Sequence, residues 1–134
     1  MTQAWINRIG TAVPPHDIHE EFVDFARSVL DDGRLVALFD RMVGLAGIEH
    51  RFSIFEPGPR PRDVFLDQRR FFQRGAFPTT GERMALFHSE ALALALQAIE
   101  RLDIGDERAK VTHLVVASCT GFTAPGLDFH IMRA

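Results

Sequence analysis

The segment VTHLVVASCTGFTAPG, residues 111–126, joins a continuous apolar run to a turn rich in glycine and proline. The run Leu114 to Ala117 is typical of a strand that is buried on both faces of a parallel sheet. The stretch Met84 to Leu102 before it is dense in alanine and leucine and contains no proline or glycine, which predicts a long helix. Helix, short connection and buried strand in this order predict an α/β fold with parallel pairing.

The sequence also predicts where the long helix begins and ends and which of its faces are buried. Thr79 and Glu82 have the spacing of a capping box, and Gly105 with Asp106 breaks the helix at its other end. Apolar residues cover more than one stripe, so we expect the helix to be buried on most sides. These residues are Leu92, Leu94, Leu96 and Ile99.

The first half of the chain predicts a mixture of strands and amphipathic helices. Two helices are expected, the first opened by a capping box at Asp17 and Glu20 and the second ended by Gly47 in a left-handed conformation. We expect these helices to pack as an antiparallel or angled pair. The predicted elements are a strand over 5–13, helices over 17–31 and 35–47, a strand over 49–55, a surface loop over 56–62 and a short helix within 63–74.

Composition narrows the class of protein. The 134 residues are 46% hydrophobic and 25% charged with a formal net charge of -3, as in an ordinary globular chain, so one domain or part of one is expected. Basic residues do not cluster as nucleic-acid binding requires, apart from the short PRPR stretch at 59–62. A single cysteine excludes an internal disulfide, and no signal peptide or membrane span is evident, so a cytoplasmic location is expected.

The predicted last strand lies too close to the end of the chain for a complete parallel sheet. A central parallel strand needs neighbours on both sides, but only Pro125 to Ala134 follow it. A crossover to another parallel strand takes about a dozen residues or more. We therefore expect this chain to be part of a larger fold.

Cys119 lies where the predicted strand ends, which is the edge at which α/β sheets bind ligands. A cysteine nucleophile needs a lowered pKa, and His113 cannot supply it within one strand because six residues span about 20 Å. On spacing alone, a small buried side chain is the favoured interpretation. The Ala124–Pro125 peptide is predicted to be cis, although a trans proline that opens a helix fits the sequence about equally well.

Two other patterns offer weaker candidates. His16, His19 and Glu20 form an HxxHE pattern that could hold a metal, but solvated residues of a first helical turn explain it better. Several arginines could bind phosphate, although scattered arginines are usually solvated charges. They are Arg41, Arg51, Arg60 and Arg62.

The residues VTHLVVASCTGFTAPGLDF (111–129) closely resemble the strand-and-turn segment of type III polyketide synthases, the chalcone-synthase-like family. DRMVGLAGIEHRF (40–52) resembles a helix-to-strand segment of the same family. The resemblance implies the N-terminal part of a thiolase-like αβαβα fold, truncated before the catalytic cysteine and spanning residues 1–134. It implies a homodimeric acyltransferase that condenses an acyl-CoA starter with malonyl-CoA by decarboxylative Claisen condensation, with no metal or bound cofactor.

The resemblance also assigns roles to residues. Cys119, Thr120, Phe122 and Ala124 would bind substrate in the acyl cavity, Cys119 as a wall and, in a minority interpretation, as a second reactive thiol. Ala124 would reach the partner's cavity, where its small size implies a long-chain starter and an alkylresorcinol- or alkylpyrone-type product. Arg41 would meet the coenzyme A phosphates, although Leu38 and Leu45 replace the lysines that flank it in the plant pattern. The family's catalytic cysteine, histidine and asparagine lie downstream, so this chain alone is expected to be inactive.

Two alternatives remain open from the sequence. A ketoacyl-carrier-protein synthase III-like enzyme fragment would share the fold and a GIxxR segment resembling Gly47 to Arg51, but the SCTGFTAPG turn argues against it. A non-catalytic half-domain that acts as an interaction module through an exposed sheet edge belongs to a different class. Starter, number of extensions and cyclisation mode are not encoded in this segment.

Overall fold

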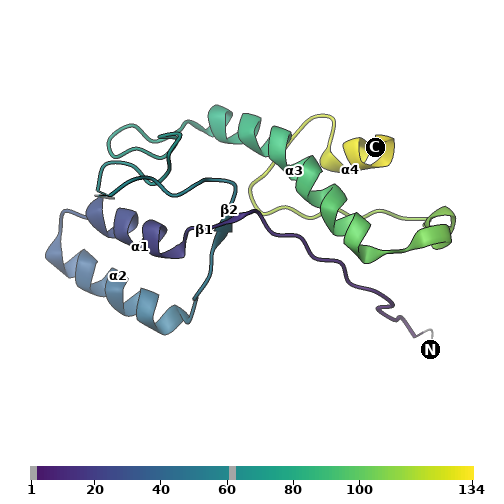
Figure 1. The fold of residues 1–134 in the computed structure, drawn as a ribbon, viewed down its shortest axis with the longest axis horizontal. Coiled ribbons are helices and arrows are strands. Elements are labelled where there is room, and N and C mark those ends of the chain that lie inside the picture. Colours follow the sequence, from purple (N-terminus) through teal and green to yellow (C-terminus); the bar gives the residue numbers. More distant parts are fainter. Residues whose placement is uncertain (1–2, 61–62) are drawn as a thin grey trace. The chain divides into compact units, whose positions relative to one another are not determined.

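The structure is a computed structural model that describes residues 3–60 and 63–134, and it divides into two compact units (Figure 1). The 14–79 unit holds β1, α1, α2 and β2. The α3 unit joins the segment that ends at Val13 to residues 80–134, with α3, the 3-10 helix η1 and α4. The overall content of helix and a small sheet is compatible with the predicted α/β class.

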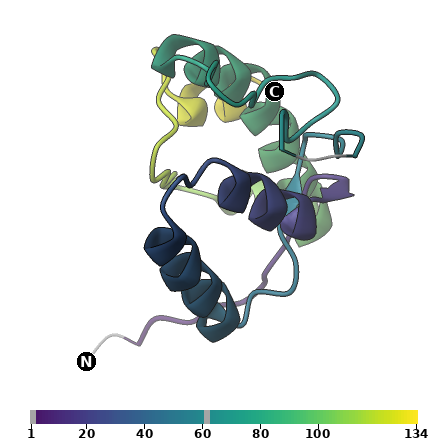
Figure 2. The same cartoon turned by 90° about the vertical axis from the view of Figure 1, so that its left-hand side faces the viewer.

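The two helices predicted in the first half are confirmed. α1 spans His19–Ser28 and α2 spans Gly33–Ala46, and the two pack side by side (Figure 2). The Asp32 carboxylate accepts a hydrogen bond of 2.7 Å from the Arg34 N–H and so caps α2. Gly47 follows with φ 60°, the left-handed conformation predicted for it, which ends the helix.

The predicted strand over 49–55 is reduced to β2, Phe52–Ser53, which pairs antiparallel with β1, His16–Asp17. The Ser53 hydroxyl accepts the Phe55 N–H at 3.2 Å, so the chain turns instead of continuing the strand. Asp17 does not form the predicted capping box, because α1 begins after Ile18 and the Asp17 carboxylate is shared between the N–H groups of His19 and Arg51.

The short helix predicted within 63–74 is wrong, because this segment folds around a buried carboxylate. Asp67 is 0% exposed, and its two oxygens accept the N–H groups of Phe71 at 3.1 Å and Phe72 at 3.0 Å. These amides are thereby engaged outside a helical ladder. The rings of Phe55, Phe71 and Phe72 pack against one another with centroids 5.2 to 5.4 Å apart.

In the α3 unit the long predicted helix is confirmed as α3, Thr80–Leu102. Its predicted burial is wrong, since none of its residues is fully buried. The strand predicted over 5–13 is also absent: this segment lies extended against the end of α3 without pairing as a strand. Gly10 makes the contact, where a Cβ would come within 2.7 Å of the Leu102 nitrogen, and Arg101 donates to the Thr11 carbonyl at 3.0 Å.

The strand predicted over 111–118 is wrong in this structure. η1, Gly105–Lys110, leads into an extended segment that pairs with no other segment of residues 3–60 and 63–134. Val115 is 89% exposed, so the apolar run lies open. A buried strand needs neighbours on each side, and the described residues supply none. α4, Leu127–Arg133, follows and packs on α3 (Figures 1 and 2).

The described helices test whether the chain could cross a membrane as a helix. In the part of the chain that the structure describes, no helix has both the length and the apolar character that crossing a bilayer requires.

Candidate functional site

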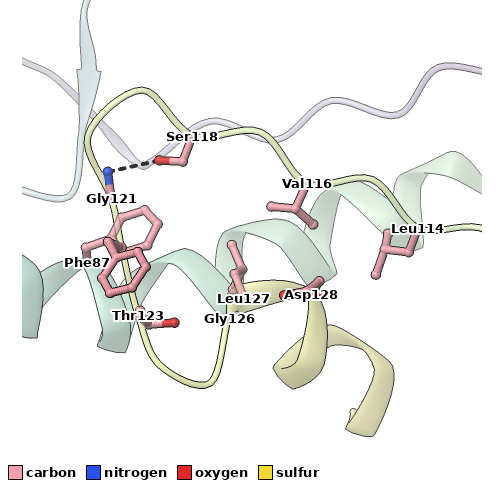
Figure 3. A pocket seen from close by; sticks show the side chains of 10 residues that line it. Phe87, Leu114, Val116, Ser118, Gly121, Thr123, Gly126, Leu127 and Asp128 are labelled. Atoms are coloured by element: carbon pink, nitrogen blue, oxygen red, sulfur yellow. Dashed lines mark hydrogen bonds between the residues drawn. The ribbon is translucent and has the colours of Figure 1, made fainter.

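The SCTGFTAPG turn and α3 enclose a hollow of about 330 Å³ (Figure 3). Its size lies at the lower end of the range of about 300 to 1,000 Å³ for small-molecule sites. The residues that line it come from α3, the extended segment, the turn and α4. They are Phe87, Leu114, Val116, Ser118, Gly121, Phe122, Thr123, Gly126, Leu127 and Asp128.

Hydrogen bonds within the turn hold its shape. The Gly121 N–H donates to the Ser118 hydroxyl at 3.0 Å, as the dashed line in Figure 3 marks. The Thr123 hydroxyl donates to the Pro125 carbonyl at 2.6 Å. The Ala124–Pro125 peptide is cis, as the sequence analysis predicted. The hydroxyls of Ser118 and Thr123 are thus engaged by the turn's own backbone, and the Asp128 carboxylate is the charged group among the lining residues.

Gly121 is required by a close approach to an aromatic ring. A left-handed backbone is not the reason, because the positive-φ glycines described are Gly47, Gly75 and Gly105. A Cβ on Gly121 would overlap the Phe87 ring, which lies directly beside the turn (Figure 3). The Phe87 ring of α3 and the backbone of Gly121 therefore pack closely and form one wall of the hollow.

Two histidines lie next to the part of α4 that borders the hollow. His88 of α3 and His130 of α4 meet edge to face with ring centroids 5.2 Å apart. The Nε2 atom of His130 is buried and has no hydrogen-bond partner within the described residues. The hollow thus combines apolar walls, internally satisfied hydroxyls and a nearby imidazole pair.

The structure places the predicted substrate-binding residues unequally around this hollow. Phe122 lines it, whereas Cys119, Thr120 and Ala124 lie on the same turn outside the lining. Cys119 is exposed, with its Sγ 4.0 Å from the Thr120 hydroxyl, so the interpretation as a buried side chain is wrong here. Arg41 lies exposed on α2, in the 14–79 unit. The binding roles of all five residues stay predictions.

Sequence reasoning missed the partners that complete the hollow. Phe87 belongs to the apolar pattern of α3, and Leu127 and Asp128 open α4, so no motif distinguishes them. The glycine at position 121 is the one sequence signal that could have indicated a bulky neighbour such as Phe87, because glycine leaves room for a close approach. Of the arginines considered for phosphate, Arg62 lies outside the described residues.

The HxxHE pattern does not assemble a metal centre within residues 3–60 and 63–134, where no group of three or more potential ligands converges. Its neighbourhood holds an ionic contact instead. Asp17 Oδ2 lies 2.6 Å from His50 Nδ1. The Arg51 N–H, His50 and the His19 N–H together lower the pKa of Asp17 to about 2, and the hydrogen bond to Asp17 raises the pKa of His50.

Comparison with known proteins finds similarity to a plant enzyme. The chain is 30% identical over 130 residues to bisdemethoxycurcumin synthase of Oryza sativa subsp. japonica, an alignment that takes in 92% of this chain and 31% of the relative. The chain therefore spans about a third of that enzyme's length. No protein-family model and no solved structure matches the chain. The similarity supports a distant chalcone-synthase-like relationship.

Proposed function

We propose that this chain forms the N-terminal part of a type III polyketide synthase, an acyltransferase that condenses an acyl-CoA starter with malonyl-CoA. The observation that carries the proposal is the SCTGFTAPG turn, which bends around a hollow of ligand size. The similarity to bisdemethoxycurcumin synthase along 92% of the chain supports the same class of enzyme. The active enzyme in this proposal is a homodimer of a longer polypeptide with a thiolase-like fold.

The hollow holds the acyl chain in this proposal. Phe87, Leu114 and Leu127 provide apolar walls, and transfer of an alkyl chain from water to such walls is favourable. The acyl group passes from the coenzyme A sulfur to an enzyme cysteine downstream of the matched segment. Malonyl-CoA then loses CO₂, and the resulting carbanion attacks the thioester. Arg41 contacts the coenzyme A phosphates, and no metal or bound cofactor takes part.

Cys119 lies outside the lining of this hollow in the 134-residue chain, and in this proposal it becomes a wall of the acyl cavity in the full-length enzyme, so its thiol is dispensable for the chemistry. We expect Cys119→Ser in the full-length enzyme to keep most of its activity with acyl-CoA and malonyl-CoA. If the variant has only the background rate and no longer forms a covalent acyl-enzyme, Cys119 is the nucleophile and this assignment is wrong.

Ala124 lies outside the lining of this hollow, and in this proposal it reaches into the cavity of the partner subunit of the homodimer. It controls the length of the starter there, because its methyl group leaves room that a larger side chain would fill. In the full-length enzyme, Ala124→Met is expected to lower kcat/KM for long-chain acyl-CoA at least tenfold relative to short-chain acyl-CoA. Ala109→Met, at an exposed position of η1, is the matched control. Equal turnover of both substrates by the Ala124 variant would refute the starter assignment.

One observation favours a second candidate, an interaction module. The extended segment 111–116 carries exposed apolar side chains, including Val115, and offers its backbone to a pairing strand. In that case the 134-residue chain would form a complex of single size that unfolds cooperatively, as measured by sedimentation and denaturant titration. A non-cooperative chain that becomes cooperative only in the longer polypeptide would exclude this candidate.

A further inference from the structure

A second hollow, of about 540 Å³, lies within the 14–79 unit on the loop that follows β2. We call it the Arg70 hollow; it is lined by Pro57, Gly58, Pro59, Phe65, Gln68 and Arg70. Two arms of the loop are joined by main-chain hydrogen bonds of 3.0 Å, from Gly58 N–H to the Leu66 carbonyl and from Gln68 N–H to the Glu56 carbonyl. The hollow is therefore bounded by paired segments.

Arg70 is held at the hollow by an uncommon backbone conformation. Its φ is 55°, which non-glycine residues seldom adopt and which persists where the surroundings enforce it. The enforcing group is Asp67, whose carbonyl accepts the Arg70 N–H at 3.0 Å. Its fully buried carboxylate binds the next two amides, those of Phe71 and Phe72. The side chain of Arg70 is thus presented from a fixed turn.

The charge of Arg70 is positioned without being neutralised. Its guanidinium lies over the Phe65 ring, 5.1 Å from the centroid. Within residues 3–60 and 63–134, no carboxylate forms an ion pair with Arg60, Arg69 or Arg70, although Arg74 of the same loop pairs with Asp31 at 2.9 Å. Arg70 therefore brings a positive charge without an ion-pair partner among these residues to the hollow, beside the apolar ring of Phe65.

We propose that the Arg70 hollow binds a small molecule that carries a diphosphate group. The planar guanidinium pairs with phosphate oxygens through two hydrogen bonds at once. Arg60, the neighbour in sequence of the lining residue Pro59, adds a second cation, which favours a multiply charged anion over a single carboxylate. The prolines and Phe65 offer an apolar wall to the uncharged remainder, and the volume lies in the range of small-molecule sites. The site shares no residue with the acyl hollow, so it stands independently of the proposed function.

The test titrates the protein with inorganic pyrophosphate, followed by calorimetry and by amide NMR shifts. We expect saturable binding with shifts centred on residues 57–58 and 65–70. Arg70→Gln should weaken binding at least tenfold, whereas Arg69→Gln, the same change at the adjacent exposed arginine, should weaken it less than threefold. Absence of binding, or equal losses in the two variants, would show only diffuse attraction and overturn the proposal.

A second variant separates binding from folding of the loop. Arg70→Gly relieves the left-handed backbone and removes the guanidinium, so the amide shifts of Phe71 and Phe72 should stay native while binding is lost. Native binding by this variant would overturn the proposal. Competition then identifies the source of the diphosphate: displacement of pyrophosphate by ADP indicates a nucleotide, and displacement by coenzyme A but not ADP indicates the thioester carrier. Displacement by neither would contradict a small-molecule ligand with an apolar part.

Discussion

The fit of Gly121 against Phe87 gives the sharpest prediction, because a single methyl group at Gly121 would overlap the ring. The ring must then leave its place or the turn must shift. Overpacking of this kind costs typically about 1 to 3 kcal/mol. We expect Gly121→Ala to lower the free energy of unfolding of the chain by an amount in that range.

A double-mutant cycle assigns this cost to the ring. In a Phe87→Ala background the space beside the turn is open, so Gly121→Ala should cost little, and the two substitutions should be coupled by about 0.5 to 3 kcal/mol. Urea denaturation followed by circular dichroism measures all four proteins. Gly44→Ala is the matched control, because a Cβ at Gly44 meets no atom within 4 Å. Gly44 lies within α2, where alanine is more stable than glycine by roughly 0.5 to 1 kcal/mol, so this variant should not be destabilised.

If Gly121→Ala unfolds at the wild-type urea concentration, or if its cost is the same with and without Phe87, the ring and the turn are not in the contact described. The apolar wall of the acyl hollow would then have to be rebuilt from other residues.

Three further predictions test the rest of the fold. Asp67→Asn replaces one of two buried acceptors with a donor, so one amide of the loop loses its partner and the free energy of unfolding should fall by about 1 to 3 kcal/mol, measured by urea titration; wild-type stability would contradict the role of this carboxylate. Gly10→Ala should destabilise the α3 unit, because a Cβ meets α3 backbone 2.7 Å away, and hydrogen exchange in α3 should rise while α1 is unchanged; protection at wild-type level would contradict the contact. The contact between Asp17 and His50 should stabilise the 14–79 unit most between about pH 4 and pH 6.5. Because the pKa of Asp17 is lowered, its contribution is lost as the pH falls from 3.8 toward about 2. Because the pKa of His50 is raised, its contribution is lost as the pH rises above 6.5. NMR titration of the His50 ring should show its pKa falling in Asp17→Asn, and an unchanged titration would exclude the contact.

The sequence by itself determined the helices. α2 and α3 were predicted from local signals, namely the left-handed Gly47 that ends α2 and the uninterrupted run of strong helix formers in α3. Each signal acts through hydrogen bonds within a few residues. The cis Ala124–Pro125 peptide was likewise predicted from two adjacent residues. Such features need no distant partner, which is why the pattern alone predicts them.

The tertiary structure decided everything that requires a second segment. The apolar run at Val115 predicts a strand, but a strand exists only where another backbone pairs with it, and the described residues provide none. The helix predicted within 63–74 gave way to a loop because the Asp67 carboxylate captured two amides. Phe87 became a wall of the candidate site because Gly121, far along the chain, leaves room for its ring. Local hydrogen bonding is encoded in neighbouring residues, whereas burial and pocket walls depend on which distant side chains meet.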